Sequence, residues 1–194
     1  MDDAWWYLTR ATGIVATILA VVSLVFGLFF SARNTGARRT PAWWLDLHNY
    51  LGGLALMFTG AHILATLLDP NSGIGIVQAV VPGTADTASW ALTWGVIATY
   101  TFAIAVFTSW PKRRFSRRVW RWLHLTSVAG VALGGLHAYQ LGSDATTVAV
   151  EVGLVVCAAF AVYAIALRII AAATKGRAAK TTATKATATK VTGR

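Results

Sequence analysis

The chain has 194 residues, of which 56% are hydrophobic and only 12% charged, and it contains nine tryptophans. Since a soluble domain carries about 25% charged residues, this composition excludes an ordinary soluble enzyme and indicates a membrane protein. The net charge of +10 does not point to nucleic acid, because nearly all of the basic residues lie beyond one end of the apolar segments.

Five apolar segments reach the length of about 20 residues that a helix needs to cross a bilayer. In chain order they cover residues 8–31, 44–68, 89–109, 119–141 and 146–172. The first is not a signal peptide, because it begins with Met1-Asp2-Asp3 and is followed by basic residues that would stop transfer. We therefore expect residues 1–174 to form an all-α bundle of five transmembrane helices within the lipid bilayer.

The charges predict how this bundle is oriented. Of the 17 Lys and Arg residues, 16 lie in loop 31–43, in loop 110–121 or at the C-terminal end, and Arg10 is the exception. The positive-inside rule makes that side cytoplasmic, so we expect a multi-pass plasma-membrane protein with its N-terminus outside and its C-terminus inside. Residues 175–194 repeat Ala, Thr and Lys without apolar residues to bury, which predicts a disordered basic cytoplasmic tail.

All four histidines lie on the second and fourth predicted spans, two on each: His48, His62, His124 and His137. On each helix the two histidines are about 20 Å apart along the axis, so they cannot share one metal ion. The two spans run in the same direction, because a single span separates them. His48 and His124 should therefore lie together near the inner face, and His62 and His137 near the outer face.

Two imidazoles at one depth fit a heme better than a bare ion. Zinc takes four ligands, whereas a heme brings four equatorial nitrogens and needs one or two axial ligands from the protein. We therefore predict two stacked bis-histidine hemes. The spacing of 13 residues between His124 and His137 leaves them about 140° apart on an ideal helix. Either the fourth span bends, as Gly134-Gly135 would allow, or the two hemes are offset around it.

Further residues could serve a porphyrin. Small residues on the two histidine spans would let a flat ring approach the backbone, or would simply pack helices: Gly52, Gly53, Gly60, Gly130, Gly134 and Gly135. The arginine-rich inner loops could hold the propionates of the inner heme. On the outer side Arg10 either binds a propionate or snorkels to the interface.

The pattern His48-x13-His62 on one helix and His124-x12-His137 two helices further on resembles the ferric reductase-like transmembrane domain over about residues 5–170. This family includes the heme-bearing cores of NADPH oxidases and ferric reductases and the heme subunits of methionine sulfoxide reductase systems. The resemblance implies that these four histidines hold two b hemes in series that carry electrons across the membrane. The flavin and nicotinamide domain that follows the core in the oxidases is not seen after residue 174.

The sequence therefore predicts a membrane cytochrome b, an electron-transfer subunit without its own flavin domain. It would take electrons from a separate flavoprotein or quinol and pass them to an external acceptor. The outer loop 69–89 could cover the outer heme, dock a partner or simply connect two spans. Two other functions stay open: a single-heme, quinol-linked subunit of a reductase system, and a heme-free proton-coupled transporter that uses histidines as relays.

Overall fold

The computed structural model describes residues 3–32, 42–86, 89–109, 115–142 and 147–192. It is helical, with the elements α1 (Asp3–Ala32), α2 (Ala42–Leu68), α3 (Ile76–Val80), α4 (Ser89–Ser109), α5 (Arg117–Leu141) and α6 (Val148–Thr192). Much of the predicted orientation depends on residues 33–41 and 110–114, which lie outside the described residues. The inside and outside assignment therefore stays a prediction, and "inner" and "outer" are used below in that sense.

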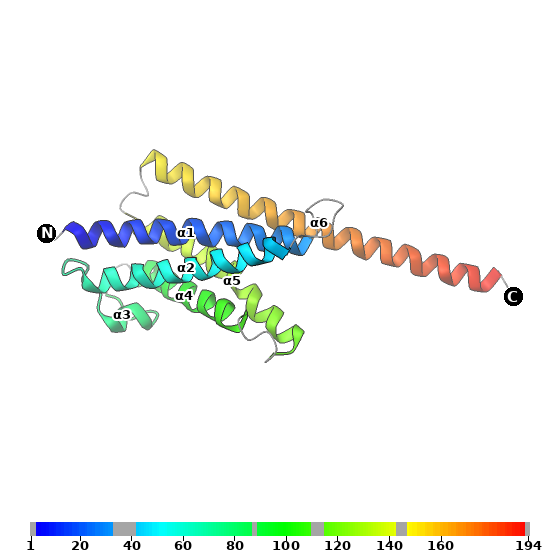
Figure 1. Ribbon diagram of the computed structural model, residues 1–194, viewed down its shortest axis with the longest axis horizontal. Helices are drawn as coiled ribbons and strands as arrows, with labels where there is room; N and C mark the ends of the chain where they lie inside the picture. Colours follow the sequence, from blue (N-terminus) through cyan, green and yellow to red (C-terminus); the bar gives the residue numbers. More distant parts are fainter. Residues whose placement is uncertain (1–2, 33–41, 87–88, 110–114, 143–146, 193–194) are drawn as a thin grey trace.

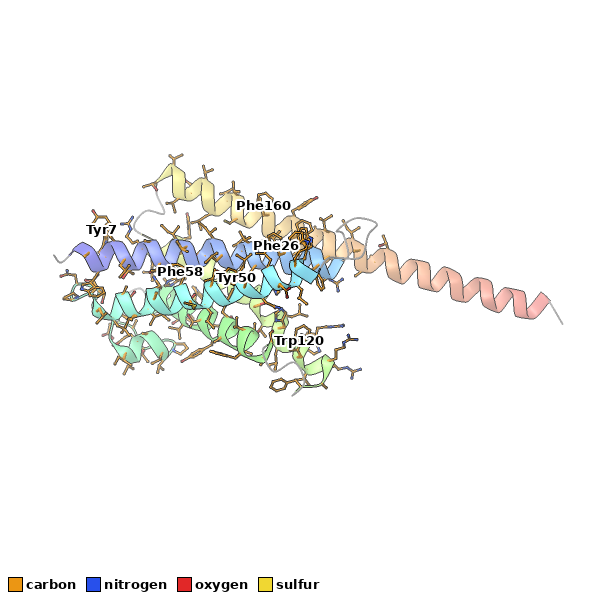
Figure 2. All side chains as sticks on the ribbon, viewed as in Figure 1. Tyr7, Phe26, Tyr50, Phe58, Trp120 and Phe160 are labelled. Atoms are coloured by element: carbon orange, nitrogen blue, oxygen red, sulfur yellow. The ribbon has the colours of Figure 1, made fainter. Side chains whose placement is uncertain are left out.

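Four of these helices are long and apolar enough to cross a membrane: α1, α2, α4 and the first part of α6. The prediction of five such spans is thus not supported for the fourth segment, residues 119–141, which forms α5. Its first turns carry Arg117, Arg118 and Arg121, and both of its histidines lie further along, which lowers its hydropathy. Many large apolar side chains of the bundle face outward, such as Phe160 on α6 (Figure 2), where lipid would cover them.

The histidine helices occupy opposite corners of a four-helix bundle. Helix α1 packs against both α2 and α5, and α4 packs against the same two helices, so α2 and α5 lie across the bundle from each other. Figure 1 shows that α2 and α5 run in one direction, while α1 and α4 run in the opposite one. Helix α6 covers the outside of α1. This arrangement directs side chains from α2 and α5 toward the same central space.

Two helix ends have clear local causes. Helix α5 begins after Ser116, whose hydroxyl accepts a hydrogen bond from the backbone N–H of Val119 and caps the first turn. Helix α2 ends before Asp69-Pro70, where the Asp69 carboxylate accepts a hydrogen bond of 2.9 Å from the N–H of Asn71 and forms a turn. These ends set the axial positions of the two helices that carry the histidines.

The outer loop after α2 lies against α4. The backbone N–H of Gly83, whose φ of +82° suits glycine, donates to the hydroxyl of Thr93 over 2.9 Å. The hydroxyl of Tyr100 donates to the carbonyl of Val80 at the end of α3. Both contacts join the loop to α4, as a connector between α2 and α4 would require.

Helix α6 continues as a helix through Thr192, and so includes most of the tail that the composition predicts to be disordered. Its many alanines explain how this backbone can be helical, since alanine has the highest helix propensity. The division of the chain near residue 174 into a bundle and a tail stays a prediction.

Candidate heme-binding site

The four histidines meet in two pairs, matched by depth as their spacing predicts. The ring centroids of His48 and His124 are 5.8 Å apart, and those of His62 and His137 are 6.1 Å apart. Each pair joins α2 to α5 across the bundle. The 13-residue spacing on α5 does not prevent the pairing, and α5 is one uninterrupted helix from Arg117 to Leu141.

Each ring is held by a neighbouring helix that contributes no histidine. On α1, the carbonyl of Ser23 accepts a hydrogen bond from Nδ1 of His48 (2.8 Å), and the carbonyl of Thr9 accepts one from Nδ1 of His62 (2.8 Å). A carbonyl can only accept, so Nδ1 carries the proton in both rings. The unprotonated Nε2 is then the nitrogen available to a metal.

Helix α4 holds the two histidines of α5 in the same way. Nδ1 of His137 donates to the carbonyl of Ala91 over 2.9 Å. Nδ1 of His124 has the carbonyl of Ala105 as a hydrogen-bond partner and lies 3.2 Å from the hydroxyl of Ser109. A histidine that ligates a metal usually donates its other ring N–H to such a partner, which fixes the tautomer and the orientation of the ring.

Three glycines make room for these rings against the backbone. A Cβ at Gly95 would lie 2.6 Å from Nδ1 of His137, one at Gly27 would lie 2.9 Å from Cε1 of His48, and one at Gly13 would lie 3.0 Å from Nδ1 of His62. Each glycine follows the accepting carbonyl by four residues. Because Cβ atoms tilt toward the N-terminus of a helix, a side chain at that position would lie where the ring approaches.

The sequence reasoning missed these three glycines and the serine that stands at the fourth equivalent position. A signal for them was present. Gly13 and Gly27 are 14 residues apart, as are Gly95 and Ser109, and the same interval separates His48 from His62. Two antiparallel helices that touch at two depths need similar intervals, so this repeat could have been found on the first and third predicted spans.

The glycines that the sequence did single out divide into three groups. Gly130 and Gly134 face α4, where a Cβ would meet atoms of Thr101 or Ala98, so they serve helix packing. Gly52 and Gly53 line a cavity beside the inner histidine pair. Gly60 and Gly135 have open space where a Cβ would stand.

The inner cavity has a volume of about 540 Å³ and is lined by residues of α1, α2, α4 and α5, including both inner histidines. This volume falls in the range of about 300–1,000 Å³ that is typical of sites for cofactors and small ligands. A second concave site of about 420 Å³ lies at the start of α5, lined by Arg117, Arg118 and Arg121 with Trp122 and Leu125. Leu125 lines both cavities, so the arginine-lined site lies next to the inner cavity.

Arg10 lies on α1, next to the Thr9 carbonyl that holds His62. Its guanidinium carbon is 3.9 Å from the centroid of the Trp6 ring, one turn earlier on the same helix. The cation is therefore at the depth of the outer pair, at the end of the bundle where the chain begins (Figure 1).

The histidine pairs have the geometry that two axial ligands require. An imidazole nitrogen binds a transition metal at about 2 Å and lies about 1 Å from its ring centroid, so two axial imidazoles on one ion have centroids about 6 Å apart. Both observed separations agree with this value. Among the described residues, no group of three His, Cys, Asp or Glu side chains could hold an ion without further ligands. The donor set therefore fits a heme.

Comparison with known proteins gives one match. The family model described as ferric reductase like transmembrane component matches residues 12–135, which is more than half of the chain. The match includes His48, His62 and His124 and ends two residues before His137. No curated protein and no solved structure matches. The extent of the family match shows that the chain belongs to the ferric reductase-like transmembrane component family.

Proposed function

We propose that this protein is a membrane cytochrome b that transfers electrons through two bis-histidine b hemes. The observation that carries the proposal is the separation of about 6 Å within each histidine pair, together with Nδ1 hydrogen bonds to backbone carbonyls at His48, His62 and His137 that orient the rings. Membership of the ferric reductase-like family supports electron transfer within a membrane.

In this proposal His48 and His124 would hold the inner heme, and His62 and His137 would hold the outer heme. A bound b heme supplies one-electron chemistry between ferric and ferrous iron. The chain contributes the ligands, their orientation by α1 and α4, and an apolar surrounding that keeps water from the sites. The histidines on each ligand helix are 14 and 13 residues apart, which sets the two sites about 20 Å apart along the bundle.

The basic residues take two roles in the proposal. Arg117, Arg118 and Arg121 line the concave site next to the inner cavity and would pair with the propionates of the inner heme. Arg10 would do the same at the outer site, stacked on Trp6. The remaining basic residues orient α1, α2, α4, α5 and α6 as five spans of the plasma membrane, with the N-terminus outside.

The electron donor in this proposal is a separate flavoprotein or quinol, and the acceptor lies outside. The match to a transmembrane component family supports this division of roles. In this proposal the protein acts as the membrane half of an oxidoreductase.

The test is the heme content of the full chain purified in detergent. We expect split α and β bands on reduction with dithionite and a pyridine hemochrome yield near two hemes per chain. A yield near one would instead favour a single-heme subunit. A yield near zero after expression with added heme would refute the proposal and leave the histidine relay, which proton flux into proteoliposomes would then test.

Single substitutions assign the sites. His48→Ala and His124→Ala should each remove the same heme, and His62→Ala and His137→Ala the other. The double variant at His48 and His124 should lose no more heme than either single variant, because residues that share one site are not additive. Cys157→Ala on α6, remote from both pairs in sequence, is the matched control and should keep two hemes.

A further inference from the structure

The inner and outer histidine pairs differ in their hydrogen-bond partners. Each outer ring donates from Nδ1 to one backbone carbonyl, and among the described residues no hydroxyl bonds to these rings. Each inner ring has a backbone carbonyl and also a serine hydroxyl, 3.2 Å from Nδ1 in both cases. These serines are Ser23 for His48 and Ser109 for His124.

The single hydrogen of each serine hydroxyl is already committed elsewhere. Ser109 donates to the carbonyl of Ala105 over 2.7 Å, and Ser23 donates to the carbonyl of His48 over 3.1 Å. A hydroxyl has one hydrogen and two lone pairs, so toward the imidazoles both serines act as acceptors. Each inner Nδ1–H group is thus shared between two acceptors, whereas each outer Nδ1–H group donates to one.

The His124 side of the inner site has one more partner. Nε1–H of Trp120 donates to the Ser109 hydroxyl over 3.4 Å, and the Trp120 ring stacks on the His124 ring with centroids 5.1 Å apart and planes 19° apart. Figure 2 labels Trp120 near the start of α5. Ser109 therefore joins α4, Trp120 and His124 in one hydrogen-bonded unit.

Hydrogen bonding at Nδ1–H changes how the imidazole binds iron. A stronger hydrogen-bond acceptor for Nδ1–H makes Nε2 more electron-rich and therefore a more basic ligand. A more electron-rich axial ligand stabilises ferric over ferrous iron, so it lowers the reduction potential of the heme. The two additional hydroxyl acceptors act in this direction on the inner site.

We propose that Ser109 is a positioning residue for His124 and that, with Ser23, it lowers the reduction potential of the inner heme. This inference rests on the proposed function, since it requires the inner heme to be bound.

The experiment is a redox titration of the full chain, followed by the heme absorbance. His62→Ala leaves the inner heme alone and assigns its midpoint potential. Ser109→Ala should raise the equilibrium constant for reduction of the inner heme several-fold, up to about tenfold. For a one-electron step, a tenfold change corresponds to an increase of about 59 mV in the midpoint potential. The outer component should stay unchanged, and Ser109→Thr, which keeps the hydroxyl, should restore the original value.

Two further variants separate this role from a general packing effect. Thr108→Val alters the neighbouring residue, whose hydroxyl bonds to the carbonyl of Ile104 in its own helix, and should leave both potentials unchanged. Trp120→Phe keeps an aromatic ring but removes the N–H that competes for the Ser109 lone pairs. It should therefore shift the inner potential downward, opposite in sign to Ser109→Ala.

The inference is overturned if Ser109→Ala moves neither component, moves both equally or does no more than Thr108→Val. If Ser109→Ala loses the inner heme altogether, Trp120→Phe decides, and an unchanged inner potential overturns the inference. A chain that never binds heme fails earlier, in the hemochrome assay, and that failure counts against the proposed function as well.

Discussion

The two helix hairpins α1–α2 and α4–α5 hold their histidine rings in the same way but with different residues. In both, the second helix carries two histidines and the first accepts a hydrogen bond from each ring through backbone carbonyls 14 residues apart. In α1 both positions four residues after these carbonyls are glycine. In α4 the first is Gly95 and the second is Ser109. The comparison teaches that close approach to the backbone is the common requirement, while the serine adds a polar contact at one ring.

The largest effect is expected from adding a side chain at the glycine whose Cβ would lie closest to a histidine ring. Gly95→Ala would place a Cβ 2.6 Å from Nδ1 of His137, so the ring must leave the Ala91 carbonyl. Loss of such a partner typically weakens metal binding by about 10–100-fold. We expect the outer heme to be lost and the inner heme to be retained, as measured by hemochrome yield and redox titration.

Gly153→Ala on α6 is the control for Gly95→Ala, because a Cβ there meets open space. It should keep both hemes. Retention of both hemes by Gly95→Ala would contradict the assignment of His137 as a ligand held by α4.

The equivalent glycine substitutions in α1 should cause smaller losses of heme. The Cβ added by Gly27→Ala would lie 2.9 Å from the His48 ring and that added by Gly13→Ala 3.0 Å from the His62 ring, so smaller shifts relieve the contact. We expect partial loss of the inner heme with Gly27→Ala and a smaller loss of the outer heme with Gly13→Ala. Heme titration of each purified variant measures both, and a reversed site preference would contradict the pairing.

The smallest effect is expected at Arg10, a cation of the α1–α2 hairpin near the outer histidine pair. Arg10 follows the accepting residue Thr9 in α1, whereas Leu92 follows Ala91 in α4. If Arg10 pairs with a propionate, Arg10→Gln should lower the outer potential slightly, because removing a nearby positive charge disfavours the added electron. Arg10→Lys, which keeps the charge, should shift it less. Equal, zero shifts in both variants would leave Arg10 as a membrane-interface anchor.

Much of the bundle and of the pairing could be read from the sequence. Apolar length located the helices, and the histidine intervals placed His48 beside His124 and His62 beside His137. The hydropathy of α5 was overestimated, because a helix whose polar residues face a bundle interior need not be apolar throughout.

The supporting contacts were harder to foresee, for a physical reason. The acceptors that hold the rings are mainly backbone carbonyls, such as those of Thr9 and Ala91, and every residue type has one. Only the absence of a side chain at Gly13, Gly27 and Gly95 leaves a trace in the sequence. That trace becomes meaningful once the antiparallel contact between the helices is known.

The carbonyl-held rings have a consequence for assembly of the protein. Because their hydrogen bonds are made to helices of the same chain, the imidazoles are already aimed when the helices pack, before any cofactor arrives. The entropy lost in fixing two side-chain torsions per histidine is then part of folding, and capture of a cofactor need not supply it. We expect the chain without cofactor to be a shaped receptor, and heme insertion to be a docking event that leaves the bundle largely unaltered.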